Sequence, residues 1–214
     1  MEILFWNIAG EYNKDTWIFQ IAIFLIELFI IFLIYKKPSK TIILCEKIFL
    51  AIYFTWIAVV YFILHGSSEF NNLLNAIPFG IIALLWIVDI FVNKVKFTRN
   101  KRYDKIVSIL YIIWFTFPIF SFLIGREWPK MFGIVFPCNL ITFTLILLIS
   151  YSKNVNYILL IILIALAVPG GFINVFEFGV WEDIIMIFVG IVATVIFSKI
   201  IFENHQCKRE SKKI

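Results

Sequence analysis

Long apolar runs, each about as long as a membrane is thick, follow one another along the whole chain. A helix needs about 20 mostly apolar residues to cross a hydrocarbon core of roughly 30 Å. The apolar residues are continuous rather than alternating, which favours helices over the strands of a β-barrel. We therefore predict an all-α, polytopic membrane protein, a bundle of seven transmembrane helices with spans at approximately 16–35, 47–65, 73–92, 106–124, 132–151, 155–176 and 183–202.

The segments that join these spans are short, so residues 1–214 are interpreted as a single integral membrane domain with a basic tail at 203–214. The fifth span carries Pro137 near its start and is joined to the sixth by residues 152–154 only. These two spans could instead pair as a tight hairpin or a re-entrant element. A bundle of six spans is therefore the alternative.

The basic residues are distributed unevenly between the two sides of the predicted bundle. With seven spans, sixteen of the 19 Lys and Arg residues fall on one side. Positive residues mark the cytoplasmic side of a membrane protein. We therefore predict that the N-terminus is outside and the C-terminus cytoplasmic, in the cell inner (cytoplasmic) membrane. Six spans would put both termini on one side and break this asymmetry.

Composition excludes most other classes of protein. The chain has 214 residues, of which 62% are hydrophobic and only 15% charged, whereas soluble domains average about 45–50% apolar and roughly 25% charged residues. The net charge of +5 comes from basic residues spread over short loops. They are expected to contact lipid headgroups, so the lipid bilayer is the predicted partner and nucleic acid is not.

No pattern of metal ligands or of catalytic residues is present. Cys45, Cys138 and Cys207 are dispersed, and His65 and His205 fall on opposite sides of the predicted bundle. Zinc and haem sites need several such ligands close together. Nucleophile-elbow, zinc-protease and phosphate-loop motifs do not occur. We therefore predict no catalytic residue, no metal and no cofactor.

Two acidic residues lie inside predicted spans, where charge is costly. Glu27 is near the middle of the first span. It is interpreted either as a ligand for an ion or proton, or as a protonated carboxyl group hydrogen-bonded to a neighbouring helix. Asp89 is near the inner end of the third span, where it can snorkel to the interface or pair with Lys94 or Lys96.

Other unusual polar residues gather at the predicted outer face. Helix breaks are expected there at Pro137 and at 169–171, and freed backbone groups at membrane depth need protein or water as partners. This arrangement predicts an outward-facing cavity, with Arg126 as the counter-ion of Glu182 or Asp183. Alternatively, the tryptophans form an interfacial belt and the Pro and Gly residues only shape loops. The candidate binding residues are Glu27, Tyr12, Asn13, Trp17, Gln20, Arg126, Trp128, Cys138, Glu182 and Asp183.

The outer-face residues also carry a resemblance to a known family. The motifs are Tyr12-Asn13 followed by Trp17-Ile18-Phe19-Gln20, then Gly125-Arg126-Glu127-Trp128-Pro129, then Gly133 with Pro137-Cys138-Asn139 and Phe143-Thr144, and finally Glu182-Asp183. In this pattern the chain resembles an uncharacterised family of small bacterial multi-span membrane proteins, known only as a domain of unknown function. Arg126 and Phe62 stand where the family pattern has histidine, which argues against histidine-based chemistry. The resemblance implies a fold and no activity.

Two main functional hypotheses follow. The first is transport or binding of a small solute or ion through an outward-facing polar pocket. The second is a non-catalytic accessory or assembly subunit that works through lateral contacts. A weaker third hypothesis is an enzyme acting on lipid or cell-envelope substrate, with Cys138 or Glu182 and Asp183 as its chemistry.

Overall fold

The computed structural model describes residues 1–36, 38–67, 72–152 and 154–210, and these residues contain helices and no strands. The expected all-helical fold is thus confirmed. Lys37, Lys153 and the last four residues of the predicted basic tail lie outside the described residues. The helices are α1 (Glu2–Lys36), α2 (Lys40–Trp56), η1 (Ile57–Leu64), α3 (Asn72–Val92), η3 (Lys101–Tyr103), α4 (Asp104–Phe115), α5 (Phe117–Leu123), α6 (Pro137–Ser150), α7 (Tyr157–Ala165), η4 (Leu166–Gly170), α8 (Gly171–Phe178), η5 (Trp181–Asp183) and α9 (Ile184–Glu210).

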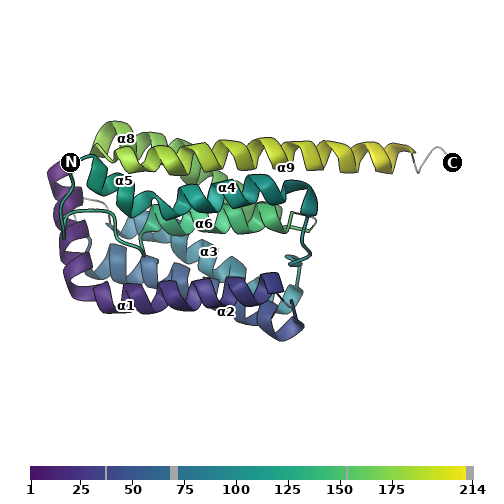
Figure 1. Cartoon of the computed structure of the whole chain (residues 1–214), viewed down its shortest axis with the longest axis horizontal. Coiled ribbons are helices and arrows are strands. Elements are labelled where there is room, and N and C mark those ends of the chain that lie inside the picture. Colours follow the sequence, from purple (N-terminus) through teal and green to yellow (C-terminus); the bar gives the residue numbers. More distant parts are fainter. Residues whose placement is uncertain (37, 68–71, 153, 211–214) are drawn as a thin grey trace.

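Successive helices run back and forth along one bundle (Figure 1). We call the end where α1, α3 and α6 begin the N-terminal end, and the end where α2, α4 and α7 begin the opposite end. α6 packs against α4, α7 and α9, and every one of its residues is buried. α6 is therefore the central helix of the bundle, while α9 extends beyond the other helices at the opposite end (Figure 1).

Several helices have the length and apolar character of membrane spans. Five helical segments among the described residues are long and apolar enough to cross a membrane, and the pair α4 and α5, bent by 46°, makes a sixth. α6 has 14 residues and is shorter than a span. The helices are thus compatible with a membrane protein.

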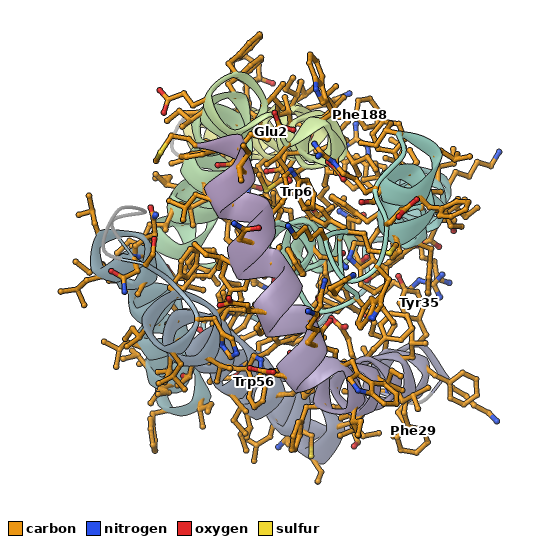
Figure 2. All side chains as sticks on the ribbon, turned by 90° about the vertical axis from the view of Figure 1, so that its left-hand side faces the viewer. Glu2, Trp6, Phe29, Tyr35, Trp56 and Phe188 are labelled. Carbon is orange, nitrogen blue, oxygen red and sulfur yellow. The ribbon has the colours of Figure 1, made fainter. Side chains whose placement is uncertain are left out.

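α1 begins much earlier than the predicted span at 16–35. Its first turns lie across the N-terminal end of the bundle, and its remainder runs along the side (Figures 1 and 2). Trp6, Ala9 and Tyr12 in the first part are buried, whereas Leu25 and Phe29 in the second part are exposed. The N-terminal segment before residue 16, which was predicted to lie outside the first span, is thus part of a helix that covers one end of the molecule.

α6 begins later than the predicted span at 132–151. Residues 125–136 are non-helical, yet Phe132 and Val135 in this segment are buried. Pro137 occupies the first turn of α6, a position where its missing N–H costs nothing. The chain therefore enters the bundle as irregular backbone before the central helix begins.

Candidate functional site

Polar residues of α1 hold the irregular segment 129–136 in place. Asn13 Nδ2 donates hydrogen bonds to the carbonyl oxygens of Pro129 at 2.7 Å and of Met131 at 2.8 Å. Tyr12 Oη donates to the carbonyl oxygen of Val135 at 2.9 Å. A buried carbonyl without a donor costs about 1–3 kcal/mol, so buried irregular backbone needs such partners. Tyr12 and Asn13 therefore support the fold at the N-terminal end.

Gln20 completes this group, which we call the α1 clamp (Tyr12, Asn13 and Gln20). Its Nε2 donates to Asn13 Oδ1 at 3.0 Å, and its Oε1 accepts from the backbone N–H of Val135 at 3.3 Å. A Cβ atom at Gly133 would lie 2.5 Å from both Asn13 Oδ1 and Gln20 Oε1. Glycine is therefore needed at 133, because any side chain would displace the clamp.

A cavity of about 500 Å³ lies at the same end of the bundle. Its wall is formed by η1, α3, α6, η4 and α8, together with the first residues of α1. η1 and η4 are both π-helices, which are rare and occur frequently at functional sites. Most of the wall is apolar, and its polar groups include Tyr61, Cys138 and Asn174.

The positions expected to break helices lie in this wall. Pro137 begins α6, and Pro169 and Gly170 end η4. A proline in a helix removes one backbone hydrogen bond and displaces the preceding turn. The cavity therefore lies where both chain segments depart from regular α-helix.

A carboxyl group positions the polar part of the wall. Cys138 Sγ donates to Asp183 Oδ2 at 3.0 Å, and Asn174 Nδ2 donates to the same oxygen at 2.6 Å. Asp183 is fully buried and lies behind these two side chains. A thiol that donates to a carboxylate is a hydrogen-bonding group, whereas a nucleophilic cysteine needs a positively charged neighbour or a base. The arrangement therefore suits binding better than nucleophilic catalysis.

Tyr61 contributes a free hydroxyl group to the same wall. The side chain is 1% exposed, and its Oη has no hydrogen-bond partner within the part of the chain that the structure describes. Its ring is fixed edge-on against Tyr12 at 5.0 Å and against Phe136 at 5.4 Å between centroids. Buried hydroxyl groups are nearly always paired, so the Tyr61 hydroxyl is an exception within the packed wall of the cavity.

Glu182 is linked to the fold rather than to the cavity. Its Oε1 accepts a hydrogen bond from Ser121 Oγ at 2.6 Å, and the same hydroxyl oxygen accepts from the backbone N–H of Phe132 at 3.0 Å. Glu182 thus joins η5 to α5 and to the irregular segment before α6.

Arg126 does not pair with Glu182 or Asp183, so that prediction is wrong. Its Nη2 lies 2.9 Å from Glu2 Oε1, and its guanidinium stacks 4.1 Å from the ring centroid of Trp6. Both partners belong to the first turns of α1 (Figure 2). Because these turns cross the N-terminal end, Glu2 reaches the arginine.

Trp17 and Trp128 are 49% and 55% exposed. Neither contributes to the cavity wall. Two of the candidate binding residues therefore lie on the outer surface of the N-terminal end, apart from the cavity.

Glu27 faces a second acid. Glu27 of α1 and Glu46 of α2 are 1% and 0% exposed, and none of their four carboxyl oxygens has a hydrogen-bond partner among the described residues. The two groups interact electrostatically. Both interpretations of Glu27, as a ligand for an ion or proton and as a protonated carboxyl group hydrogen-bonded to a neighbouring helix, stay predictions. Glu46 was expected outside the second span, but α2 begins at Lys40 and buries it.

Asp89 pairs with Lys47, so both predicted roles of Asp89 are wrong. Lys47 Nζ lies 2.8 Å from Asp89 Oδ2, and both side chains are buried. The backbone N–H groups of Lys94 and Val95 each donate to Asp89 Oδ1 at 3.0 Å. Asp89 cannot snorkel because α2 and α3 pack together over it.

Across the described residues, no group of three or more His, Cys, Asp and Glu side chains is placed to hold a metal ion.

A family model described as "Family of unknown function (DUF6064)" matches residues 1–208. The chain belongs to this family. The family resemblance of the sequence is thus confirmed. The comparison with curated proteins found no match, and the comparison with solved structures found none either. In this DUF6064 chain, two of the motifs that carry the family resemblance lie in contact. The α1 clamp belongs to one and Gly133 to the other, and they touch although they are far apart in the sequence.

Three residues that sequence reasoning missed belong to this end of the DUF6064 chain. Tyr61 and Asn174 line the cavity, and Ser121 binds Glu182. Asn174 gave one usable signal, since it is the only amide side chain in the sixth apolar run, 155–176, beyond its first turn. Tyr61 gave a signal only through the family resemblance, in which Tyr61-Phe62 stands at a Tyr-His position, and Ser121 gave none, because hydroxyl groups in apolar runs commonly bind their own helix.

Proposed function

We propose that this chain is a multi-pass membrane protein that binds a small, partly apolar solute in the cavity at its N-terminal end, as a binding protein or transporter. The observation that carries the proposal is the cavity of about 500 Å³ with polar groups at one part of an apolar wall. Small-molecule sites in proteins have this form, with volumes of about 300–1,000 Å³ and few polar groups.

The wall indicates the chemistry of the solute. Phe62, Phe79 and Ile141 supply apolar surface, which suits an aromatic or aliphatic body. Cys138 and Asn174 supply hydrogen-bonding groups, and Asp183 lies directly behind both. We infer that a hydrogen-bond donor such as an amine on the solute points toward these groups.

We further propose seven passes, with the N-terminus outside and the C-terminus in the cytoplasm of the inner membrane. In this arrangement α6 is the short central pass, completed by the irregular segment 129–136, in which Phe132 and Val135 are buried. Irregular backbone at membrane depth is tolerated where protein surrounds it, as the α1 clamp does here. The excess of Lys and Arg at the opposite end supports a cytoplasmic location for that end. The solute cavity would then face outward.

A second candidate function, as an accessory or assembly subunit, is favoured by one observation. α9 extends beyond the bundle at the opposite end (Figure 1), and its apolar residues Val195 and Phe202 are each 63% exposed. A projecting helix of this kind can pack against another membrane protein through lateral contacts.

The solute proposal is tested by filling the cavity. Gly170→Leu places a side chain in the cavity wall, where a Cβ atom has no neighbour closer than 3.7 Å. Gly80→Leu on α3 is the matched control, since a Cβ atom there has no neighbour within 4 Å and Gly80 is not in the cavity wall. Native mass spectrometry of protein purified in mild detergent should find a small molecule retained by the wild type and by Gly80→Leu, and lost from Gly170→Leu. Identical bound molecules in all three proteins would contradict the proposal.

A further inference from the structure

We propose that the opposite end of the bundle binds an anionic phospholipid. Its phosphate lies between Lys40 and Lys96, and an acyl chain follows the groove between α2 and α3. This inference rests on the membrane location proposed above but not on the solute cavity, from which it is separated by the length of the bundle.

The headgroup pocket has a volume of about 480 Å³ and lies where α2 begins and α3 ends. Three lysines form part of its wall, with the side chains of Asn93 and Thr98 beside them. Ammonium, amide and hydroxyl groups are the donors that bind phosphate oxygens. The partial positive charge of a helix N-terminus, here that of α2, acts in the same direction.

The charge of this pocket is not balanced within the part of the chain that the structure describes. Lys47 is paired with Asp89, whereas Lys40 and Lys96 have no ion pair among the described residues. Lys47 also donates to Asn93 Oδ1 at 2.7 Å, which holds the amide at the pocket rim. Two uncompensated positive charges therefore remain for an anion.

An apolar groove continues from the pocket along the helices. It has a volume of about 460 Å³ and is lined by residues of α2, η1 and α3 only. Ile90 belongs to both walls, so the pocket and the groove adjoin. Ile52 and Ile87 in the groove are 62% and 41% exposed. Trp56, labelled in Figure 2, also lines the groove.

A phospholipid matches both the lysine-lined pocket and the apolar groove that adjoins it. A basic pocket between helices at the cytoplasmic side is a site where lipid headgroups bind, and the adjoining groove offers apolar surface for one acyl chain. A soluble phosphate would use the pocket and leave the groove without an occupant. The combination therefore favours a lipid over a free anion.

The test compares lipid binding by two charge variants of the full chain. Lys40→Gln with Lys96→Gln removes both uncompensated charges and spares the buried Lys47. Lys101→Gln with Lys105→Gln is the matched control, because these exposed lysines lie at the same end and outside the pocket. The dissociation constant for phosphatidylglycerol is measured by native mass spectrometry, with phosphatidylcholine and inorganic phosphate as the other probes. Thr55→Phe, which fills the groove from an exposed position, tests the acyl-chain part.

A lysine near an anionic lipid contributes about fivefold in affinity, so the pocket variant is expected to bind phosphatidylglycerol roughly twentyfold more weakly. Thr55→Phe should also weaken binding, and the control variant should bind as the wild type does. Equal losses in the pocket and control variants would overturn the proposal, because the attraction would then belong to the whole basic surface. Inorganic phosphate that competes fully with phosphatidylglycerol, or phosphatidylcholine that binds equally well, would overturn it too.

Discussion

Lys47 and Asp89 form a buried ion pair that joins α2 to α3, with Nζ and Oδ2 2.8 Å apart. Removing one member of such a pair leaves an uncompensated buried charge, which typically costs about 3–5 kcal/mol. Here Asp89 also accepts from the backbone of Lys94 and Val95. Removal of either partner alone is therefore expected to be strongly destabilising at the opposite end.

Asp89→Ala should lower the free energy of unfolding in detergent by about 3–5 kcal/mol, measured by denaturant titration. Asp104→Ala is the control, because its partner Arg99 leaves it in an exposed ion pair, and such pairs contribute about 1 kcal/mol or less. Similar losses in the two variants would show that the Lys47 pair has no special role.

At Gly133, the absence of a Cβ atom allows the α1 clamp to pack against the backbone. Gly133→Ala would bring a methyl group within 2.5 Å of both Asn13 Oδ1 and Gln20 Oε1. Overpacking of this kind costs about 1–3 kcal/mol, so we expect a clear fall in thermal unfolding temperature. Gly80→Ala, in open space, should change it little, and a similar fall in both variants would contradict the clamp geometry.

At the scale of elements, the first part of α1 and the irregular segment 129–136 stabilise each other. The segment has few regular backbone hydrogen bonds of its own and depends on donors from residues more than 100 positions away. The covering helix in turn buries Trp6 and Tyr12 against this end of the bundle. A change that disrupts the first part of α1 should therefore also destabilise the segment 129–136, and the reverse should hold.

Asn13→Ala should expose this coupling. Two carbonyl groups would lose their donor, at a cost of about 1–3 kcal/mol each. We expect faster hydrogen exchange in residues 129–136 and in the first turns of α1, with α3 unchanged. Trp17→Leu, at an exposed position without a hydrogen bond to the segment, is the control. Unchanged exchange in the Asn13 variant would contradict the role of the clamp.

Elements that face outward could be predicted from the sequence, and those that depend on distant contacts could not. The span predicted at 73–92 matches α3 at Asn72–Val92, because an apolar surface imposes a continuous run on the sequence. The starts of α1 and α6 depend on packing between segments far apart in the chain. The same holds for the Lys47–Asp89 pair, whose members are 42 residues apart.

In the candidate site, too, some features could be predicted from the sequence and others depend on contacts between distant segments. The Pro and Gly positions pointed to the region where the structure has a cavity, since chain breaks have a local signature, and Cys138 lines that cavity. The hydrogen-bonding role of the α1 clamp and the pairing of Arg126 with Glu2 could be recognised only from the three-dimensional structure, because the partners are far apart in the sequence. A polar residue in an apolar run does not reveal by itself whether its partner is a ligand or the backbone of another segment.

For the whole molecule, the two ends have different chemistry. The N-terminal end carries the covering helix, the α1 clamp and a mostly apolar cavity, whereas the opposite end carries a lysine-lined pocket. We proposed that the first end faces outward and the second the cytoplasm. This orientation can be tested with single cysteines.

In a chain whose native cysteines are replaced by serine, Glu127→Cys should react with a membrane-impermeant maleimide in intact cells. Lys101→Cys should react only after the membrane is permeabilised. Both positions are exposed, so the membrane alone should decide their reaction. The reverse pattern would contradict the orientation, and equal labelling of both in intact cells would contradict a membrane between the two ends.

The central claim is that the cavity lined by Tyr61, Cys138 and Asn174 accepts a small, partly apolar molecule. Its most direct test is the dissociation constant of one aromatic amine, 1-aminoanthracene, measured by native mass spectrometry on three proteins. The wild type and Gly80→Leu should bind one molecule with similar affinity. Gly170→Leu should bind about tenfold or more weakly, a change of about 1.4 kcal/mol. Equal affinity in Gly170→Leu and Gly80→Leu, or no saturable binding by the wild type, would contradict the claim.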